Sequence, residues 1–448
     1  MLINNVLELS LLLVISYLRA GRADPEITEN IAADESKDSI VVENSSQYGF
    51  PTTPWLPYYF FSPMMQPQYT SALSTRTWGT LFVPFTSCTS PMRETGICEE
   101  SSTCTRLGGR ASGSCVNGRV CCINVVTNTC DEADRKVITL DNTYWQSPIT
   151  GISSFITSCA ITVKLDAKLA EQGKAVCQVR LNFVLFSIGQ PDSESVCNTD
   201  TFDVAGASNK IPTICGDNDG QHMYLNVPPS STSPTDLQLT FNFGANSNPI
   251  RTWNILISMI PCDSANLAPS DCLQYFTASS GMIKSFNWRD FDGTTTRQLA
   301  NQDYSICFRT APGFQRSLCL TPCKVTSTQK PFSISLAKAI ADGAPLIDQS
   351  QLGSINCNND FLVIPGGKNI GNPAIQTDIA FDRYCGERLN ALPGNAASTT
   401  VCTTATPFRL LYRTNGDETL TDTTDIDPNV GGVPSNGNQG FCLSFRNQ

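Results

Sequence analysis

The residues of this chain that could do chemistry are its cysteines, its carboxylates and one histidine. The 448 residues include 20 cysteines and a single histidine, His222. One histidine excludes a mechanism that uses two, together with most histidine-based zinc sites. So many thiols would be a liability in a reducing compartment, whereas in a secreted chain they are typical of a disulfide framework. The cysteines therefore predict covalent cross-links.

Acidic side chains dominate the charge of the chain. There are 40 Asp and Glu residues against 30 Lys and Arg, which gives a formal charge of −10. This balance argues against a general nucleic-acid binder, because phosphates require an excess of cationic side chains. No carboxylate pair stands out as an acid–base centre. We expect His222 to be a turn or strand residue bonded to a backbone carbonyl, with a pH switch as the alternative.

The N-terminus predicts a secreted, extracellular protein. Val6–Leu18 form an apolar run that is too short to span a bilayer, and Gly21–Ala23 follow with the small residues of a cleavage site. We therefore predict a signal peptide at residues 1–23. A buried helix is the alternative, since no Lys or Arg precedes the run and Glu8 lies inside it. No later stretch is long and apolar enough to span a membrane.

Residues 24–85 are expected to form a disordered tail that is first acidic and then rich in proline and aromatic residues. Residues 24–48 hold seven acids and one Lys, too polar to offset the chain entropy of folding. Residues 48–69 alternate prolines with aromatic rings, which favours a linker, with an extended partner-binding segment as the alternative. Asn44 begins a glycosylation sequon in this exposed part.

Beyond the tail, the hydrophobic pattern has a period of two. Apolar and polar residues alternate in four segments: Val179–Leu185, Leu237–Phe243, Trp253–Met259 and Phe408–Tyr412. Such alternation predicts antiparallel strands with one buried face, separated by short turns as in a β-sandwich. The one helix-like stretch is Leu336–Leu346. The fold class is therefore predicted to be all-β, with antiparallel β-sandwiches.

The first cysteine module is small and dense. Six cysteines fall between Cys88 and Cys122, in a segment too short to build a core without cross-links. Cys121 cannot easily pair with its neighbour Cys122, so each needs another partner. The runs Thr95–Cys98 and Arg119–Cys122 resemble the clip domain of arthropod serine proteases and their homologues.

For residues 86–124, this resemblance implies the pairs Cys88–Cys121, Cys98–Cys115 and Cys104–Cys122. Clip domains usually precede a trypsin-like domain. Here no Gly-Asp-Ser-Gly-type segment follows, and His222 does not lie in a protease-like Ala-Ala-His-Cys setting. We therefore expect that this chain is not an enzyme.

The remaining cysteines contain an internal repeat. Cys197-Asn-Thr-Asp200 is followed by Cys215-Gly216, and Cys357-Asn-Asn-Asp360 is followed by Cys385-Gly386. This constellation resembles the CUB domain, an extracellular β-sandwich, and implies CUB-like domains at residues 128–263 and 271–446. More narrowly, the chain resembles secreted arthropod CUB proteins of unassigned role, in which a clip-like knot precedes two CUB-like domains.

The CUB resemblance also implies disulfides. The implied pairs are Cys130–Cys159, Cys197–Cys215, Cys272–Cys307 and Cys357–Cys385. For the six cysteines that remain, which allow about 15 connectivities, the preferred pairs are Cys177–Cys262, Cys402–Cys442 and Cys319–Cys323.

Many CUB domains bind calcium through a Glu, the Asp of Cys-x-x-Asp and a later Asp. In the first copy, Asp200 is kept, but Gly189 and Gly244 stand near the other two positions. Glycine has no side-chain ligand, so we expect this site to be vestigial, with Asp192 or Glu194 as the substitutes that could rescue it.

The second copy keeps more of the pattern. Asp360 is present, Asn415 stands where the later Asp would be, and Asp417 follows in a loop that continues with further acids. The resemblance implies a calcium site at these three residues, since a hard cation requires several oxygens in one loop cluster. The alternative is a solvated acidic loop that caps the strand ends.

The resemblance implies a secreted, non-catalytic recognition or adaptor protein. The CUB-like domains would bind an extracellular protein partner, with a calcium-organised acidic patch that takes a Lys or Arg side chain. The alternative is a structural component of extracellular matrix or cuticle. The pattern predicts neither the identity of the partner nor an oligomeric state.

Overall fold

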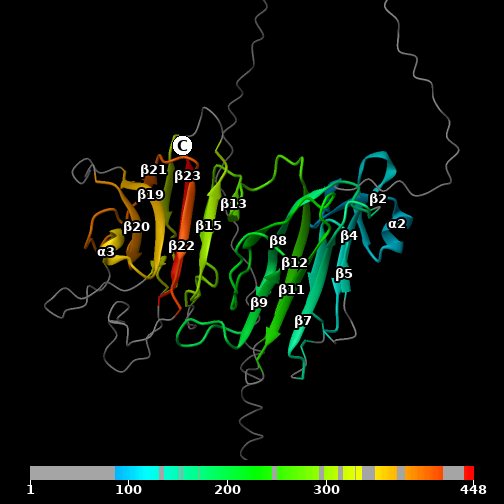
Figure 1. Cartoon of the computed structure of the whole chain (residues 1–448), viewed down its shortest axis with the longest axis horizontal. Coiled ribbons are helices and arrows are strands. Elements are labelled where there is room, and N and C mark those ends of the chain that lie inside the picture. Colours follow the sequence, from blue (N-terminus) through cyan, green and yellow to red (C-terminus); the bar gives the residue numbers. More distant parts are fainter. Residues whose placement is uncertain are drawn as a thin grey trace, which may run out of the picture. The chain divides into compact units, whose positions relative to one another are not determined.

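The computed structural model describes residues 86–448, except for 131–135, 150, 153–154, 170, 245–249, 292–296, 311–315, 328, 335–348, 371–378 and 417–437. The expectations for the signal peptide, the tail with Asn44, and the helix-like stretch Leu336–Leu346 lie outside these residues. In the part that is described, regular structure is almost entirely strand, which confirms the all-β class (Figure 1). No helix among these residues is long and apolar enough to cross a membrane.

A small cysteine knot begins the described chain. Its elements are β1 (Ser87–Thr89), β2 (Thr95–Glu99), α2 (Ser101–Arg106), β3 (Arg110–Ser114), the 3-10 turn η1 (Val116–Gly118) and β4 (Val120–Thr127). Neighbouring residues of a strand point to opposite faces. Cys121 accordingly packs with Tyr144 and Leu256, while Cys122 packs with Ile97 on the other side. This is why adjacent cysteines join different partners.

The knot and the first sandwich share one sheet. The order is β1-β2-β4-β6-β12-β8-β10, with β3 also paired to β4. The strands added here are β6 (Thr143–Gln146), β8 (Val176–Ser187), β10 (His222–Asn226) and β12 (Thr252–Pro261). Because β4 pairs with β6 in parallel from Asn124 to Thr127, the sheet continues across residue 124, where the knot was expected to end.

The second sheet of the first sandwich has the order β5-β7-β11-β9. Its strands are β5 (Lys136–Ile138), β7 (Ser158–Leu165), β9 (Asp200–Ala205) and β11 (Thr235–Phe243). The alternation predicted for Leu237–Phe243 is confirmed, since its apolar residues are buried. Trp253 stacks on Phe241 at a centroid distance of 4.3 Å and contacts Trp145 edge-on, so aromatic rings fill the space between the sheets.

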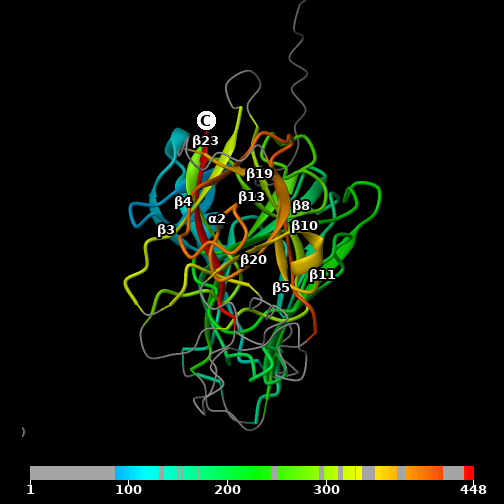
Figure 2. The same ribbon diagram turned by 90° about the vertical axis from the view of Figure 1, so that its left-hand side faces the viewer.

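The second sandwich, which faces the viewer in Figure 2, contains the remaining strands. They are β13 (Cys272–Phe276), β14 (Ser280–Lys284), β15 (Asp303–Phe308), β16 (Leu318–Pro322), β17 (Phe332–Ser333), β18 (Ser350–Leu352), β19 (Phe361–Asn369), β20 (Phe381–Gly386), β21 (Val401–Thr403), β22 (Arg409–Arg413) and β23 (Gly440–Asn447), with α3 at Gly353–Asn356. The main path is β13-β15-β22-β19-β21-β16-β23-β14. Strand β19 pairs with β22 through Phe361–Val363 and with β21 through Lys368 and Asn369, so a single strand bends to join both layers.

All 20 cysteines lie in the described residues, and none is free. Eight pairs coincide with those expected: Cys88–Cys121, Cys98–Cys115, Cys104–Cys122, Cys130–Cys159, Cys177–Cys262, Cys197–Cys215, Cys272–Cys307 and Cys357–Cys385. The last two expected pairs, Cys319–Cys323 and Cys402–Cys442, are wrong. The structure joins Cys319 to Cys402 and Cys323 to Cys442.

Strand geometry explains this correction. Cys319 lies within β16 and Cys323 directly follows it, and four residues of extended chain span about 13 Å, beyond the reach of a disulfide. Antiparallel pairing of β16 with β21 instead places Cys319 opposite Cys402, with their Cα atoms 4.0 Å apart. The backbone N–H of Cys323 donates to the carbonyl of Cys442, which brings those two side chains together.

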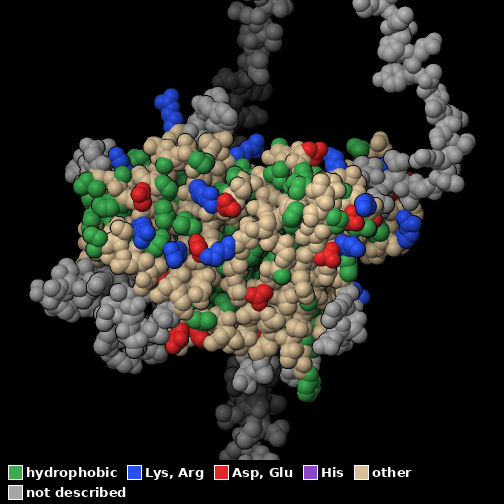
Figure 3. Space-filling view, in the orientation of Figure 1, with side chains coloured by type: hydrophobic (Ala, Val, Ile, Leu, Met, Phe, Trp, Pro, Cys, Tyr) green, Lys and Arg blue, Asp and Glu red, His purple; other side chains and the backbone are tan. Residues whose placement is uncertain are grey.

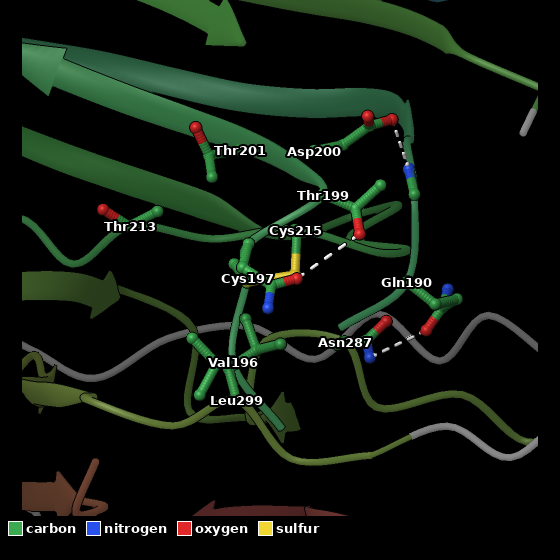
Figure 4. Close-up of a disulfide and its surroundings, with 12 residues drawn as sticks. Gln190, Val196, Cys197, Thr199, Asp200, Thr201, Thr213, Cys215, Asn287 and Leu299 are labelled. Carbon is green, nitrogen blue, oxygen red and sulfur yellow. Dashed lines mark hydrogen bonds between the residues drawn. A yellow bond between two sulfur atoms is a disulfide. The ribbon is translucent and has the colours of Figure 1, made fainter. Parts of the chain in front are cut away.

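The two sandwiches meet through buried polar contacts centred on Asn287. Its side-chain oxygen accepts the N–H of Asp217 at 2.9 Å, and its own N–H donates to Asn218 Oδ1 at 2.9 Å. Its amide nitrogen donates to Gln190 Oε1 at 3.0 Å (Figure 4). Gly216 has a φ of +73°, and a Cβ there would lie 2.0 Å from Asn287 Oδ1. Only glycine fits this close approach.

Candidate functional site

Asp200, at the start of β9, has a side chain that is completely buried. Arg251 donates from Nε to Oδ2 and from Nη2 to Oδ1, both at 2.8 Å. The backbone N–H groups of Gly189 and Gly244 donate to the same two oxygens at 2.8 and 3.1 Å. Figure 4 shows Asp200 beside the Cys197–Cys215 disulfide. Four donors from two loops, β8–β9 and β11–β12, therefore converge on one carboxylate.

This donor set does not fit a calcium ion at Asp200. The guanidinium of Arg251 supplies the positive charge, and both carboxylate oxygens already accept two hydrogen bonds. A Cβ at Gly189 would lie 2.9 Å from Asp200 Cγ, so a longer side chain at position 189 would require the carboxylate to move. Calcium is usually coordinated by about six to eight oxygen atoms. Around Asp200, the neighbouring groups are hydrogen-bond donors and not oxygen ligands.

Asp192 does not replace the missing ligands, and Glu194 is exposed. Asp192 Oδ1 accepts the N–H groups of Glu194 and Val196, both at 2.9 Å. Its Oδ2 accepts the side-chain amide of Asn198 at 2.6 Å. The carboxylate of Asp192 therefore closes its own loop.

Arg251 and Trp253, a cation and an aromatic residue two positions apart, are both buried. Trp253 is 1% exposed, and the guanidinium carbon of Arg251 lies 4.7 Å from the centre of the Phe243 ring. These side chains pack within the sandwich and are not exposed binding anchors.

Asp360, the equivalent residue of the second copy, is also completely buried. Gln298 Nε2 donates to its Oδ2 at 2.6 Å, and the backbone N–H of Asn415 donates to its Oδ1 at 2.7 Å. Gln298 Oε1 in turn accepts the hydroxyl of Tyr412 at 2.9 Å. The structure thus brings Asp360 and Asn415 together, while Asp417 lies outside the described residues. Both of these donors to Asp360 are neutral groups.

The fit of a calcium ion at Asp360 is partial. The Asp360 carboxylate offers the oxygen ligands that calcium prefers. Asn415, whose backbone N–H contacts Asp360, begins the acidic loop that would supply further oxygens. Gln298, however, presents its amide nitrogen to the carboxylate, so a cation there requires this amide to turn. Among the described residues, the one close group of three metal-ligating side chains is Cys88, Cys98 and Cys115, and all three sulfurs belong to disulfides.

His222 lies on β10 and is buried. Its Nε2 accepts the backbone N–H of Tyr275 at 3.0 Å, so it binds a backbone amide and not the carbonyl that the sequence suggested. Burial and, to a smaller extent, the nearby charge of Arg180 lower the pKa of His222 to about 3, against the opposing effect of the hydrogen bond from Tyr275. The imidazole is therefore neutral at physiological pH, which excludes a charge switch in that range.

A further charged residue was not singled out by the sequence. Arg180 is one of the polar residues that alternate along β8, and strand register places it between Tyr224 on β10 and Ser258 on β12. Its guanidinium carbon lies 5.4 Å from the centre of the Tyr224 ring. Burial raises the pKa of Tyr224, and the charge of Arg180 opposes that shift. Acidic and basic side chains are interspersed on the face shown in Figure 3. That face therefore has no extended patch of one charge, and electrostatic recognition there would depend on individual residues.

One protein-family model matches the region of the second sandwich. Residues 269–448 match the animal CUB domain. The knot and the first sandwich lie outside this CUB region, so their likeness to clip and CUB domains stays a prediction. No curated protein matches the chain.

Solved structures also match the chain, at low sequence identity. The CUB1-EGF-CUB2 domains of rat MASP-1 have 12% identity and a TM-score of 0.22, with 70% of this chain and 100% of that chain covered. The corresponding human MASP-1/3 domain has 14% identity and a TM-score of 0.19, with 68% and 98% covered. The full extracellular region of zebrafish Gpr126/Adgrg6 has 12% identity and a TM-score of 0.22, with 70% and 36% covered. TM-scores this low do not establish a shared arrangement.

Proposed function

We propose that this chain is a secreted, non-catalytic recognition protein that binds an extracellular protein partner. The observation that carries the proposal is the match of residues 269–448 to the animal CUB domain. The pairing of all 20 cysteines supports an oxidising compartment. Disulfide-linked strands also hold the connecting loops on a rigid scaffold, which is the arrangement that recognition loops use.

The contact is proposed to lie at Asp360, Asn415 and Asp417 in the CUB region. A calcium ion bound there would order the acidic loop, and the loop would accept a Lys or Arg side chain of the partner. The complete burial of Asp360 and its contact with Asn415 support this choice. In the first sandwich, Arg251 takes the place of a cation, so recognition there would not depend on calcium.

Calcium titration of the full chain tests the metal. We expect calorimetry to show binding in the range of about 10⁻⁴–10⁻³ M that is typical of extracellular modules. Asp360→Asn should abolish this binding. Asp263→Asn, which removes an acid whose side chain is 69% exposed, should leave it unchanged. An absence of heat at millimolar calcium, or equal binding by Asp360→Asn, contradicts the calcium site.

Affinity capture tests the partner. The immobilised full chain is exposed to the organism's extracellular fluid with calcium or with a chelator, and the retained proteins are identified by mass spectrometry. A discrete partner that chelation and Asp360→Asn both release supports the proposal. Retention of a partner in the chelator removes calcium from it but keeps recognition. Capture of bulk matrix proteins alone favours the structural role in matrix or cuticle.

A further inference from the structure

A polar cavity of about 720 Å³ lies on the first sandwich. Its lining includes Arg180 and Asn182 of β8, and Leu256 and Ser258 of β12, which share one face of the sheet. The knot borders the cavity through β1 and β2, and the segment that follows β12 borders it at residues 263–266. The cavity therefore lies where the knot, the sheet and the start of the connection to the second sandwich meet.

Arg180 is the residue of this cavity whose charge is not compensated. No salt bridge joins its guanidinium to a carboxylate in the described part of the chain, and its buried Nε has no hydrogen-bond partner there. Ser258, which lies opposite Arg180 on β12, donates a hydrogen bond from its hydroxyl to Asn142 Oδ1 at 2.7 Å. Arg180 as a whole is half-buried, so a ligand carboxylate would reach its terminal Nη groups and not the buried Nε.

The other charged groups of the cavity already have partners. Lys174 pairs with Asp263 at 3.1 Å, and both side chains are more than half exposed. Asp141 Oδ1 accepts the backbone N–H groups of Asn142 and Met259 at 2.8 and 2.7 Å. The charge that the cavity offers to a ligand is therefore the positive charge of Arg180.

We infer that this cavity binds a Glu or Asp side chain of an acidic segment in a protein partner. A guanidinium presents a planar fork of donors that matches a carboxylate, and partial burial strengthens such a pair. The Tyr224 ring, which is 3% exposed, lies 5.4 Å from the guanidinium carbon and supports the guanidinium from the buried side. The inference goes beyond the calcium-dependent contact, because it places a second contact of opposite charge on the first sandwich.

The test uses the full chain and a short capped peptide in which glutamate and tyrosine alternate. Fluorescence anisotropy of the labelled peptide measures its affinity, and a matched peptide with glutamine in place of glutamate controls for charge. We expect the acidic peptide to bind, and we expect the affinity of the glutamine peptide to be at least about tenfold lower. Arg180→Gln should weaken acidic-peptide binding by a similar factor, while Arg446→Gln, at an exposed arginine of β23, should not change it.

A second variant keeps the inference falsifiable if Arg180→Gln disturbs the fold. Asn182→Asp adds a carboxylate two residues along the same face of β8, inside the cavity, where it competes for Arg180. It should also weaken binding of the acidic peptide. Equal binding of both peptides, insensitivity to both variants, or no binding overturns the inference. Binding of a heparin-derived sulfated oligosaccharide in place of the peptide also overturns it.

Discussion

Arg251 and Asp200 form a buried, two-pronged ion pair, with both nitrogen–oxygen distances at 2.8 Å. The two residues are 51 positions apart, and the side chains are 6% and 0% exposed. Arg251 Nη2 also donates to the carbonyl of Gly244 at 3.0 Å. One guanidinium thus links the end of β11 to the start of β9.

Removal of Arg251 should destabilise the first sandwich strongly, because it leaves a buried carboxylate without its counter-charge. We expect Arg251→Met to lower the free energy of unfolding by about 3–5 kcal/mol. Asp200→Asn combined with Arg251→Met should cost less than the sum of the single changes, since neither charge then remains. Denaturant unfolding measures the cycle. Additive losses would mean that the two side chains are not coupled.

Non-reducing peptide mapping should distinguish the two possible pairings in the second sandwich. Trypsin leaves Cys319 and Cys323 on one peptide, because no Lys or Arg lies between them. Cys402 and Cys442 fall on two other peptides. The observed disulfides predict a single species of three linked peptides. Recovery of the Cys319–Cys323 peptide alone would refute this connectivity.

Asp141 should make stability depend on pH. Burial raises its pKa from 3.8 to about 6, against the hydrogen bonds from Met259 and Asn142. The folded state therefore holds this proton more tightly than the unfolded state. Its contribution is fully present below about pH 4 and is lost as the pH rises through about 6, a change of about 2–4 kcal/mol.

The Asp141→Asn variant tests this dependence. Between pH 4 and pH 7, its unfolding midpoint should fall less than that of the unmodified chain, because Asn has no proton to lose. Asp263→Asn, at an exposed acid, should preserve the original slope. Identical slopes for all three proteins would rule out Asp141 as the titrating group.

Asn287 should hold the two sandwiches together. Asn287→Ala leaves the backbone N–H of Asp217 and the side-chain oxygen of Gln190 without their partner. We expect the free energy of unfolding to fall by about 1–3 kcal/mol. Faster proteolytic cleavage between the sandwiches, at residues 263–271, is the measurement. Gly216→Ala should act in the same direction, since the new methyl group would overlap Asn287. Unchanged cleavage in both variants would show that this contact does not hold the interface.

Local patterns predicted much of the fold. Alternation of apolar residues identified strands such as β11, because side chains of a strand alternate between its two faces. Gly189 and Gly244 predicted that the calcium site at Asp200 is vestigial, because glycine has no side chain that could bind the ion. The resemblance of the cysteine spacing to known domains correctly implied the three disulfides of the knot.

Long-range pairing decided the rest of the site. Nothing near Arg251 in the sequence indicates that its guanidinium reaches Asp200, and Arg180 looks like any polar residue of an alternating strand until register places it in a cavity. Cys319 and Cys323 are close in sequence but separated by the extended geometry of β16.

The sequence by itself determined several strands, most of their buried residues and most cross-links. An irregularity in the pairing of β8 with β12 exposes Leu185, which the alternation placed on the buried face, and buries Phe186 in its place. Only the tertiary structure decided which charges and cysteines meet, because sheet register joins residues that are far apart along the chain.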